Sequence, residues 1–86
     1  MATITVKKLA DDRFEVSVED QTSTTHQVTV SPQYAKKLMG NRASIDVLIY
    51  DSFEFLLARE PNTSILRNFD LSLIAQYFPE YERSID

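Results

Sequence analysis

The chain has no cysteine, no tryptophan, one histidine and one glycine among its 86 residues. The lack of cysteine excludes disulfides, thiolate zinc sites and a cysteine nucleophile, and it fits the reducing cytoplasm, which is the location we expect. A single glycine and a single histidine leave no glycine-rich phosphate loop and no Ser-His-Asp arrangement. We therefore expect a protein that is not an enzyme and that binds no cofactor.

Long apolar segments are also missing. No unbroken apolar run exceeds four residues, so the sequence predicts no membrane-spanning segment. The start of the chain has no basic segment followed by an apolar run, so we expect no signal peptide. A composition of 43% hydrophobic and 10% aromatic residues is typical of a globular protein. Two separate cores would each be too small to fold alone at this length, which predicts one domain over residues 1–86.

Charge is divided unevenly along the chain, which carries a formal net charge of −4. Residues 1–43 hold six basic and five acidic side chains, whereas residues 44–86 hold three basic and eight acidic ones. Nucleic-acid binders usually present a net basic surface, because phosphate neutralisation supplies much of their affinity. The acidic half argues against nucleic acid as a partner. In the basic half, the candidates for binding an anionic ligand are Lys36, Lys37 and Arg42.

The first thirty residues predict three β-strands. Apolar and polar side chains alternate near residues 3–8, 14–19 and 25–30, and short polar stretches separate these segments. Short connections join antiparallel neighbours, so we expect a three-stranded antiparallel meander over residues 1–31. The side chains expected on its buried face are Ile4, Val6, Phe14, Val16, Val18, Val28 and Val30. His26 is expected to face inward and to be partly buried, or to be exposed if the register shifts by one residue.

The periodicity changes to that of helices from residue 32 onward. Ser31, which precedes a proline, is the predicted N-cap of a short helix over Gln33–Met39, and Gly40 is placed for a left-handed cap at its end. Ser44 is the predicted N-cap of a longer helix from Ile45 to about Glu60, which a proline ends. The apolar arc of this helix is about twice the usual width, so it must be covered on two sides.

The last quarter of the chain is rich in aromatic residues. Asp70 is the predicted N-cap of a third helix over Leu71–Phe78, and Pro79 stops it. This tail either closes the core over the main helix or forms an exposed aromatic and acidic patch that binds a partner. The candidates for such a contact are Tyr77, Glu80, Tyr81 and Glu82. Together the segments predict an α+β fold, in which the N-terminal meander is followed by three helices packed on one face.

The remaining polar groups point to no catalytic or metal site. His26 has no predicted nucleophile or carboxylate beside it, so we expect a packed or hydrogen-bonded histidine. The carboxylate pairs at 11–12 and 19–20 lie in predicted turns, where aspartate commonly bonds the backbone. Asp51 and Glu54 stand three residues apart on the main helix, but no Glu-x-x-His accompanies them. We therefore predict no metal site.

Three segments of the second half, Ser52–Leu66, Phe69–Ile74 and Tyr77–Glu82, resemble short bacterial proteins that have no assigned activity. The resemblance covers about a third of the chain and includes the sequences Phe-Asp-Leu and Tyr-Phe-Pro-Glu-Tyr-Glu. It implies that the main helix, the Glu-Pro break after it and the aromatic tail form one unit. It implies no mechanism.

These features favour a small non-enzymatic module for protein interaction or regulation. Its partner would be another protein or a second copy of the chain, because a three-stranded sheet has free edges that can pair. The alternative is a site for an anionic ligand or nucleic acid at Lys36, Lys37 and Arg42.

Overall fold

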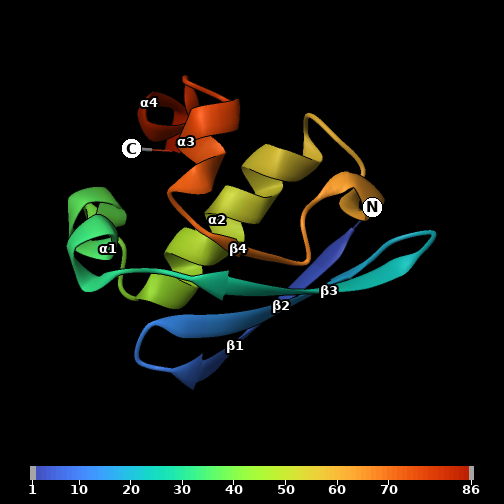
Figure 1. Cartoon of the computed structure of the whole chain (residues 1–86), viewed down its shortest axis with the longest axis horizontal. Coiled ribbons are helices and arrows are strands. Elements are labelled where there is room, and N and C mark those ends of the chain that lie inside the picture. The colour runs from blue at the N-terminus through green and yellow to red at the C-terminus, as the bar shows by residue number, and fades with distance from the viewer. Residues whose placement is uncertain (1, 86) are drawn as a thin grey trace.

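The computed structural model describes residues 2–85. A twisted β-sheet forms one layer, and the helices lie together on one face of it (Figure 1). The elements are β1 (Thr3–Ala10), β2 (Arg13–Glu19), β3 (Ser23–Thr29), α1 (Pro32–Met39), α2 (Ile45–Leu57), the 3-10 helix η1 (Asn62–Ser64), β4 (Asn68–Asp70), α3 (Leu73–Tyr77) and α4 (Tyr81–Ile85). The predicted α+β fold is thus confirmed. Within residues 2–85, no helix has the length and apolar character needed to cross a membrane.

The N-terminal meander has the predicted arrangement. β2 pairs antiparallel with both β1 and β3, and Val16 lies opposite Val6 on one side and His26 on the other. The alternation places one side-chain face against the helices. The residues of this face that are buried are Phe14, Val16, Val18, Thr24, His26, Val28 and Val30. Ile4 and Val6 point the same way but are only half-buried, because β1 lies at the edge of the sheet.

A fourth strand, which the sequence analysis did not predict, joins the sheet beside β3. β4 runs parallel to β3 and gives the strand order β1-β2-β3-β4. The N–H of Gln27 donates to the C=O of Arg67 at 2.7 Å, and the N–H of Leu71 donates to the C=O of Thr29 at 2.8 Å. A strand of three residues is too short to show a period of two in the sequence.

The short helix α1 begins as predicted. The Oγ of Ser31 accepts a hydrogen bond from the N–H of Tyr34 at 3.2 Å, and Pro32 occupies the first helical position. Ala35 and Leu38 are buried. Gly40 has a φ of 54°, the positive value that favours glycine, although its ψ of −125° differs from that of a left-handed cap.

The main helix α2 ends at Leu57, three residues before the predicted end. The N–H groups of both Arg59 and Glu60 donate to the C=O of Leu56, so the chain continues as a turn. Ser44 occupies the predicted N-cap position, but its side chain makes no capping hydrogen bond. The start of α2 therefore lacks the side-chain cap that the sequence predicted.

The wide apolar arc of α2 is covered on two sides, as expected. On one side the ring of Phe53 lies 5.4 Å from that of His26 and 6.1 Å from that of Phe69, which belong to the sheet. On the other side the ring of Phe55 lies 5.8 Å from Phe78 and 5.2 Å from Tyr81 of the tail. The tail thus completes the core.

The first helix of the tail is shorter than the predicted helix over 71–78, and a second helix forms where a last helical turn over 80–85 was expected. The tail thus forms two helices of five residues each, α3 and α4, with Phe78–Glu80 between them. Asp70 ends β4, and its carboxylate accepts hydrogen bonds from the N–H and hydroxyl groups of Ser72 at 2.9 and 2.8 Å. It therefore stabilises the turn before α3 and is not the N-cap. Leu71 and Ile74 are buried.

Candidate protein-interaction groove

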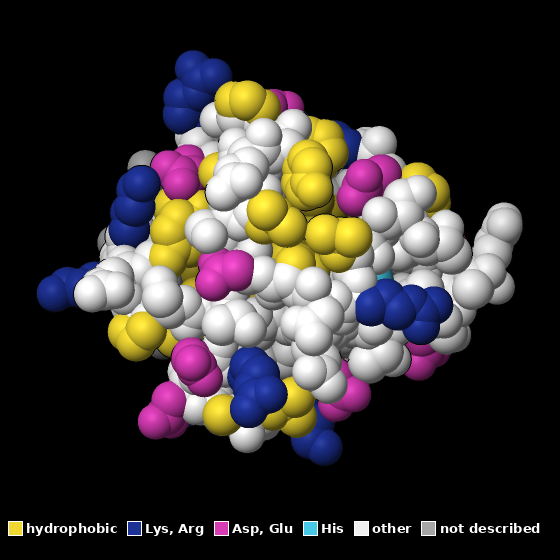
Figure 2. Space-filling view, in the orientation of Figure 1, with side chains coloured by type: hydrophobic (Ala, Val, Ile, Leu, Met, Phe, Trp, Pro, Cys, Tyr) yellow, Lys and Arg dark blue, Asp and Glu magenta, His cyan; other side chains and the backbone are white. Residues whose placement is uncertain are grey.

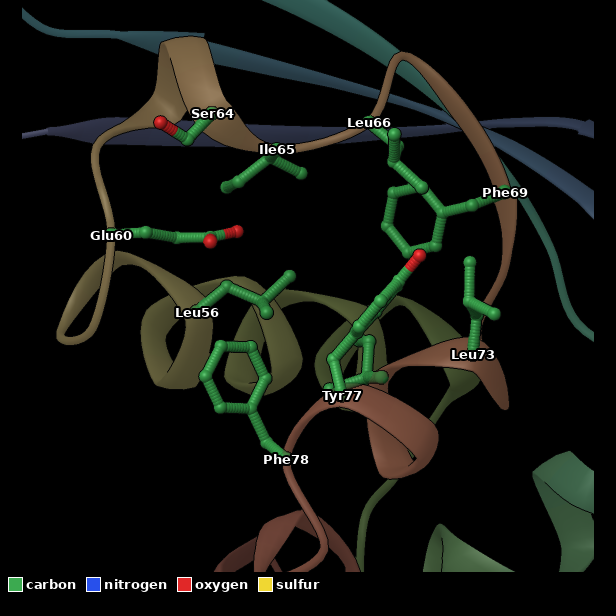
Figure 3. Close-up of a pocket in the computed structure, with 10 residues that line it drawn as sticks. Leu56, Glu60, Ser64, Ile65, Leu66, Phe69, Leu73, Tyr77 and Phe78 are labelled. Carbon is green, nitrogen blue, oxygen red and sulfur yellow. The ribbon is translucent and has the colours of Figure 1, made fainter.

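An apolar groove of about 400 Å³ lies between the end of α2, the segment that follows it, β4 and α3 (Figure 3). We call it the α2–α3 groove. It is lined by Leu56, Glu60, Ser64, Ile65, Leu66, Phe69, Leu73, Ile74, Tyr77 and Phe78. Most of these side chains are aliphatic or aromatic, and only three carry a polar group. A concave apolar surface with a few polar groups is typical of a binding site.

The chain path explains why this groove stays open. After α2 ends, Pro61 and η1 lead the chain back to the sheet, where Ile65 and Phe69 are buried and form the floor. α3 stands on the far side and has only five residues. It is too short to cover the floor, so the space between α2 and α3 remains accessible.

Two exposed hydrophobic side chains lie at the rim of the groove. Tyr77 is 66% exposed and Leu66 is 48% exposed, and both line the groove. In Figure 2, hydrophobic side chains gather on this face, between α3 and the segment that precedes β4. Single exposed hydrophobic residues are normal on protein surfaces, but a cluster around a concavity marks an interaction site.

Among the described residues that line the groove, only Glu60 is charged. Its half-buried side chain points into the groove from the turn that follows α2 (Figure 3). Neighbouring Arg59 does not neutralise it, because its guanidinium lies 3.6 Å from the ring centroid of Phe55 and 3.4 Å from the Glu80 carboxylate. Within residues 2–85, no hydrogen bond or ion pair engages the Glu60 carboxylate. This end of the groove therefore favours a cation.

Tyr81, one of the predicted contact residues, is fully buried, which corrects that prediction. Its hydroxyl lies 2.6 Å from the Oγ of Ser52, which itself donates to the C=O of Leu48 at 2.7 Å. Tyr81 is therefore the donor to Ser52. Burial raises the pKa of Tyr81 to about 12. Its position at the start of α4, which folds back on α2, makes it a core residue.

The acidic residues of the tail contact the rest of the chain. Glu82 accepts a hydrogen bond from the hydroxyl of Tyr34 at 2.8 Å and pairs with Lys37 at 3.1 Å, and these contacts lower the pKa of its carboxyl. Burial and the bond to Glu82 raise the pKa of Tyr34. Glu80 pairs with Arg59. Of the four predicted contact residues, only Tyr77 lines the groove.

The three candidate anion-binding residues do not converge on a free site. The Nε of Arg42 lies 3.0 Å from the Asp51 carboxylate, and its other nitrogens donate to the C=O groups of Leu38 and Ile85. Lys37 pairs with Glu82, and only Lys36 projects without such a contact among residues 2–85. Arg42 thus joins the ends of α1 and α4 to α2. Anion binding here stays a prediction that this geometry does not favour.

His26 is buried and hydrogen-bonded, in agreement with the prediction. Its Nδ1 lies 2.8 Å from the C=O of Leu66, and its Nε2 lies 2.9 Å from the Oγ1 of Thr24. Because a carbonyl only accepts, Nδ1 carries the proton and Nε2 accepts from the threonine hydroxyl. Desolvation by burial lowers the pKa of His26, which favours the neutral ring. The histidine therefore fixes Leu66, at the rim of the groove, to strand β3.

Asn62 is a buried polar residue for which the sequence pattern predicted no role. Its Nδ2 donates to the C=O of Thr22 at 2.6 Å and to the Oγ1 of Thr24 at 3.1 Å. It thereby attaches η1 to the turn between β2 and β3. In the sequence, a polar residue directly after a proline looks the same whether it is buried and hydrogen-bonded or lies in a solvated loop.

Among residues 2–85, no group of three or more histidine, cysteine, aspartate or glutamate side chains is placed to hold a metal ion. No protein-family model matches the chain, and no curated protein or solved structure matches it. The function therefore has to be inferred from the chemistry of the groove.

Proposed function

We propose that the protein is a non-enzymatic interaction module that binds a short apolar and basic segment of a partner protein in the α2–α3 groove. One observation supports this most directly: an accessible apolar groove contains a single carboxylate, Glu60, without a counter-ion among the described residues. A fitting segment would place a bulky aliphatic or aromatic side chain against Leu66 and Tyr77. It would place a lysine or arginine beside Glu60.

The size of the groove limits the ligand. About 400 Å³ is near the lower end of the range for small-molecule sites, and it accommodates one or two large side chains rather than a folded domain. Tyrosine is a frequent hot spot in such contacts, because it contributes a large apolar surface at low entropic cost. A contact of this size would be transient. The net charge of −4 would also attract a basic partner.

Selection from a library of random linear peptides tests this proposal, with the full-length protein as bait. We expect the enriched peptides to combine a bulky apolar residue with a nearby lysine or arginine. The affinity of one enriched peptide is then measured by fluorescence polarisation. Tyr77→Ala and Glu60→Gln should each weaken binding by roughly tenfold, which corresponds to about 1.4 kcal/mol. Tyr50→Ala is the matched control, because this tyrosine is 41% exposed outside the groove.

Three results would contradict the proposal. The first is that no peptide is enriched over a bait-free selection. The second is equal binding to wild type and Tyr77→Ala, which would place the peptide elsewhere. The third is equal loss in Tyr77→Ala and Tyr50→Ala, which would mean that binding is not specific to the groove.

A further inference from the structure

The strand β1 forms an open edge of the sheet, opposite the edge at which β4 and the groove lie. It contains eight residues, and among residues 2–85 it pairs only with β2. Its pairing is regular from Thr3 to Lys8, and a register shift follows before Ala10. An open strand of this length presents unpaired N–H and C=O groups to which another strand can bind.

The hydrogen-bond pattern shows which backbone groups of β1 are free. The N–H of Val30 donates to the C=O of Asp12, which makes these two residues a hydrogen-bonded pair in the register of β2 and β3. Hydrogen-bonded pairs alternate along an antiparallel ladder, so the backbone groups of the even-numbered residues of β2 bond to β3. Those of the odd-numbered residues point to β1. Thr5 lies opposite the odd-numbered Ser17, and the odd-numbered residues of β1 therefore bond to β2. The N–H and C=O groups of the even-numbered residues in Ile4–Lys8 consequently point to the open edge.

An incompletely covered apolar strip lies beside this edge. Ile4 and Val6 are half-buried on the inner face of β1, and α2 presents Val47 and Tyr50 next to them, 42% and 41% exposed. Val6, Val47 and Tyr50 also line a second, shallow groove, together with Asp46. Free hydrogen-bonding groups and exposed apolar surface thus occur at the same place.

The charges beside this strip are complementary to one another. Of the two lysines of β1, only Lys8 shares the inner face with Ile4 and Val6, whereas α2 contains Asp46, Asp51 and Glu54 and no basic residue. Asp51 is already paired with Arg42, while Asp46 and Glu54 are exposed. Lys8 makes an exposed ion pair with Asp11 at 3.7 Å within its own chain. A second β1 added at the edge would bring its Lys8 toward the acidic residues of this α2, and by symmetry the second α2 would receive Lys8 of the first copy.

We propose that two copies of the chain associate through antiparallel pairing of their β1 strands about a twofold axis at Val6. In this register Val6 lies opposite Val6 of the second copy, and Thr5 lies opposite Lys7. The two lysines of one strand then avoid those of the other, since like charges directly opposite each other are destabilising. One continuous sheet results, with both α2 helices on the same face.

Light scattering coupled to size-exclusion chromatography tests the association over a dilution series. We expect a mass of twice 9.9 kDa that falls toward the monomer on dilution. Tyr50→Lys should shift the protein to the monomer, because it places a cation in the apolar strip, on the side where Lys8 of the second copy arrives. Its circular dichroism should not change, since Tyr50 is exposed. A monomeric wild type at the highest concentration would overturn the proposal.

Cysteine cross-linking tests the register, because the chain has no cysteine of its own. Directly paired residues in hydrogen-bonded positions have Cα atoms about 5.5 Å apart, within the range of a disulfide. Val6→Cys should therefore give an oxidised dimer rapidly. Leu9→Cys is the control, because Leu9 is 45% exposed on the same strand. In the proposed register, Leu9 of one copy does not lie opposite Leu9 of the other. Equal or faster cross-linking of Leu9→Cys would contradict the register.

Discussion

The two tyrosines of the tail should respond in opposite ways to truncation. Tyr81 is fully buried, its ring packs edge-on at 5.2 Å from that of Phe55, and its hydroxyl bonds to Ser52. Replacing a buried aromatic residue with alanine costs about 3–5 kcal/mol. The total stability of a domain of this length is roughly 4–13 kcal/mol. Tyr81→Ala should therefore remove a large part of the free energy of unfolding.

Tyr81→Phe separates the hydroxyl from the ring. The ring contacts remain, and Ser52 keeps its acceptor, the C=O of Leu48 at 2.7 Å. Only the bond from the tyrosine hydroxyl is lost, so we expect a cost of about 1 kcal/mol. Tyr77→Ala removes a side chain that is 66% exposed and should change stability by less than about 0.5 kcal/mol.

Urea unfolding followed by circular dichroism measures these differences, and it avoids tyrosine fluorescence, which the substitutions would change. The midpoints should follow the order Tyr77→Ala, Tyr81→Phe, Tyr81→Ala from highest to lowest, with similar m-values. Equal destabilisation by the two alanine substitutions would refute the packing of α4 against α2. It would return Tyr81 to the surface, where the sequence had suggested it.

Two further predictions concern His26 and Arg42. Because burial lowers the pKa of the only histidine, the unfolded chain binds its proton first as the pH falls below about 6.5. The free energy of unfolding should be constant above about pH 7.5 and should fall below about pH 6.5, by at most about 1.4 kcal/mol per pH unit. In urea unfolding, His26→Asn should not show this fall of stability with pH. A slope that persists in His26→Asn would contradict the assignment. Arg42→Lys keeps the charge but cannot reach all three oxygen partners, so it should cost about 1–3 kcal/mol in the same assay. Lys36→Ala, at an exposed position, should cost less than about 0.5 kcal/mol, and equal costs would contradict the role of Arg42.

The sequence predicted those features that depend on neighbouring residues. Alternation over seven or eight residues identified the three strands of the meander, and Ser31 and Gly40 marked the ends of α1, because capping is a local interaction. The width of the apolar arc of α2 correctly indicated that a second surface covers this helix. These patterns can be recognised without knowing which distant segments of the chain contact the residues.

The remaining features depend on contacts between distant segments. β4 has three residues, and its pairing with β3 could not be read from a local pattern. Tyr77 and Tyr81 stand four residues apart, the spacing that places side chains on one face of a continuous helix. The stop at Pro79 was predicted, but the packing of α4 against α2, which buries Tyr81 and leaves Tyr77 exposed, depends on distant residues. The groove itself is assembled from several segments of the second half of the chain.

The contact between β3 and the segment before β4 also has a consequence for the order of folding. The hydrogen bond from His26 to Leu66 joins residues 40 positions apart, and both helices α1 and α2 lie between them. The meander can form from local contacts, whereas the parallel pairing of β4 requires closure of this long loop. The groove should therefore be among the last parts to form. By the same reasoning, it should be among the first parts lost in a partial opening of the native state.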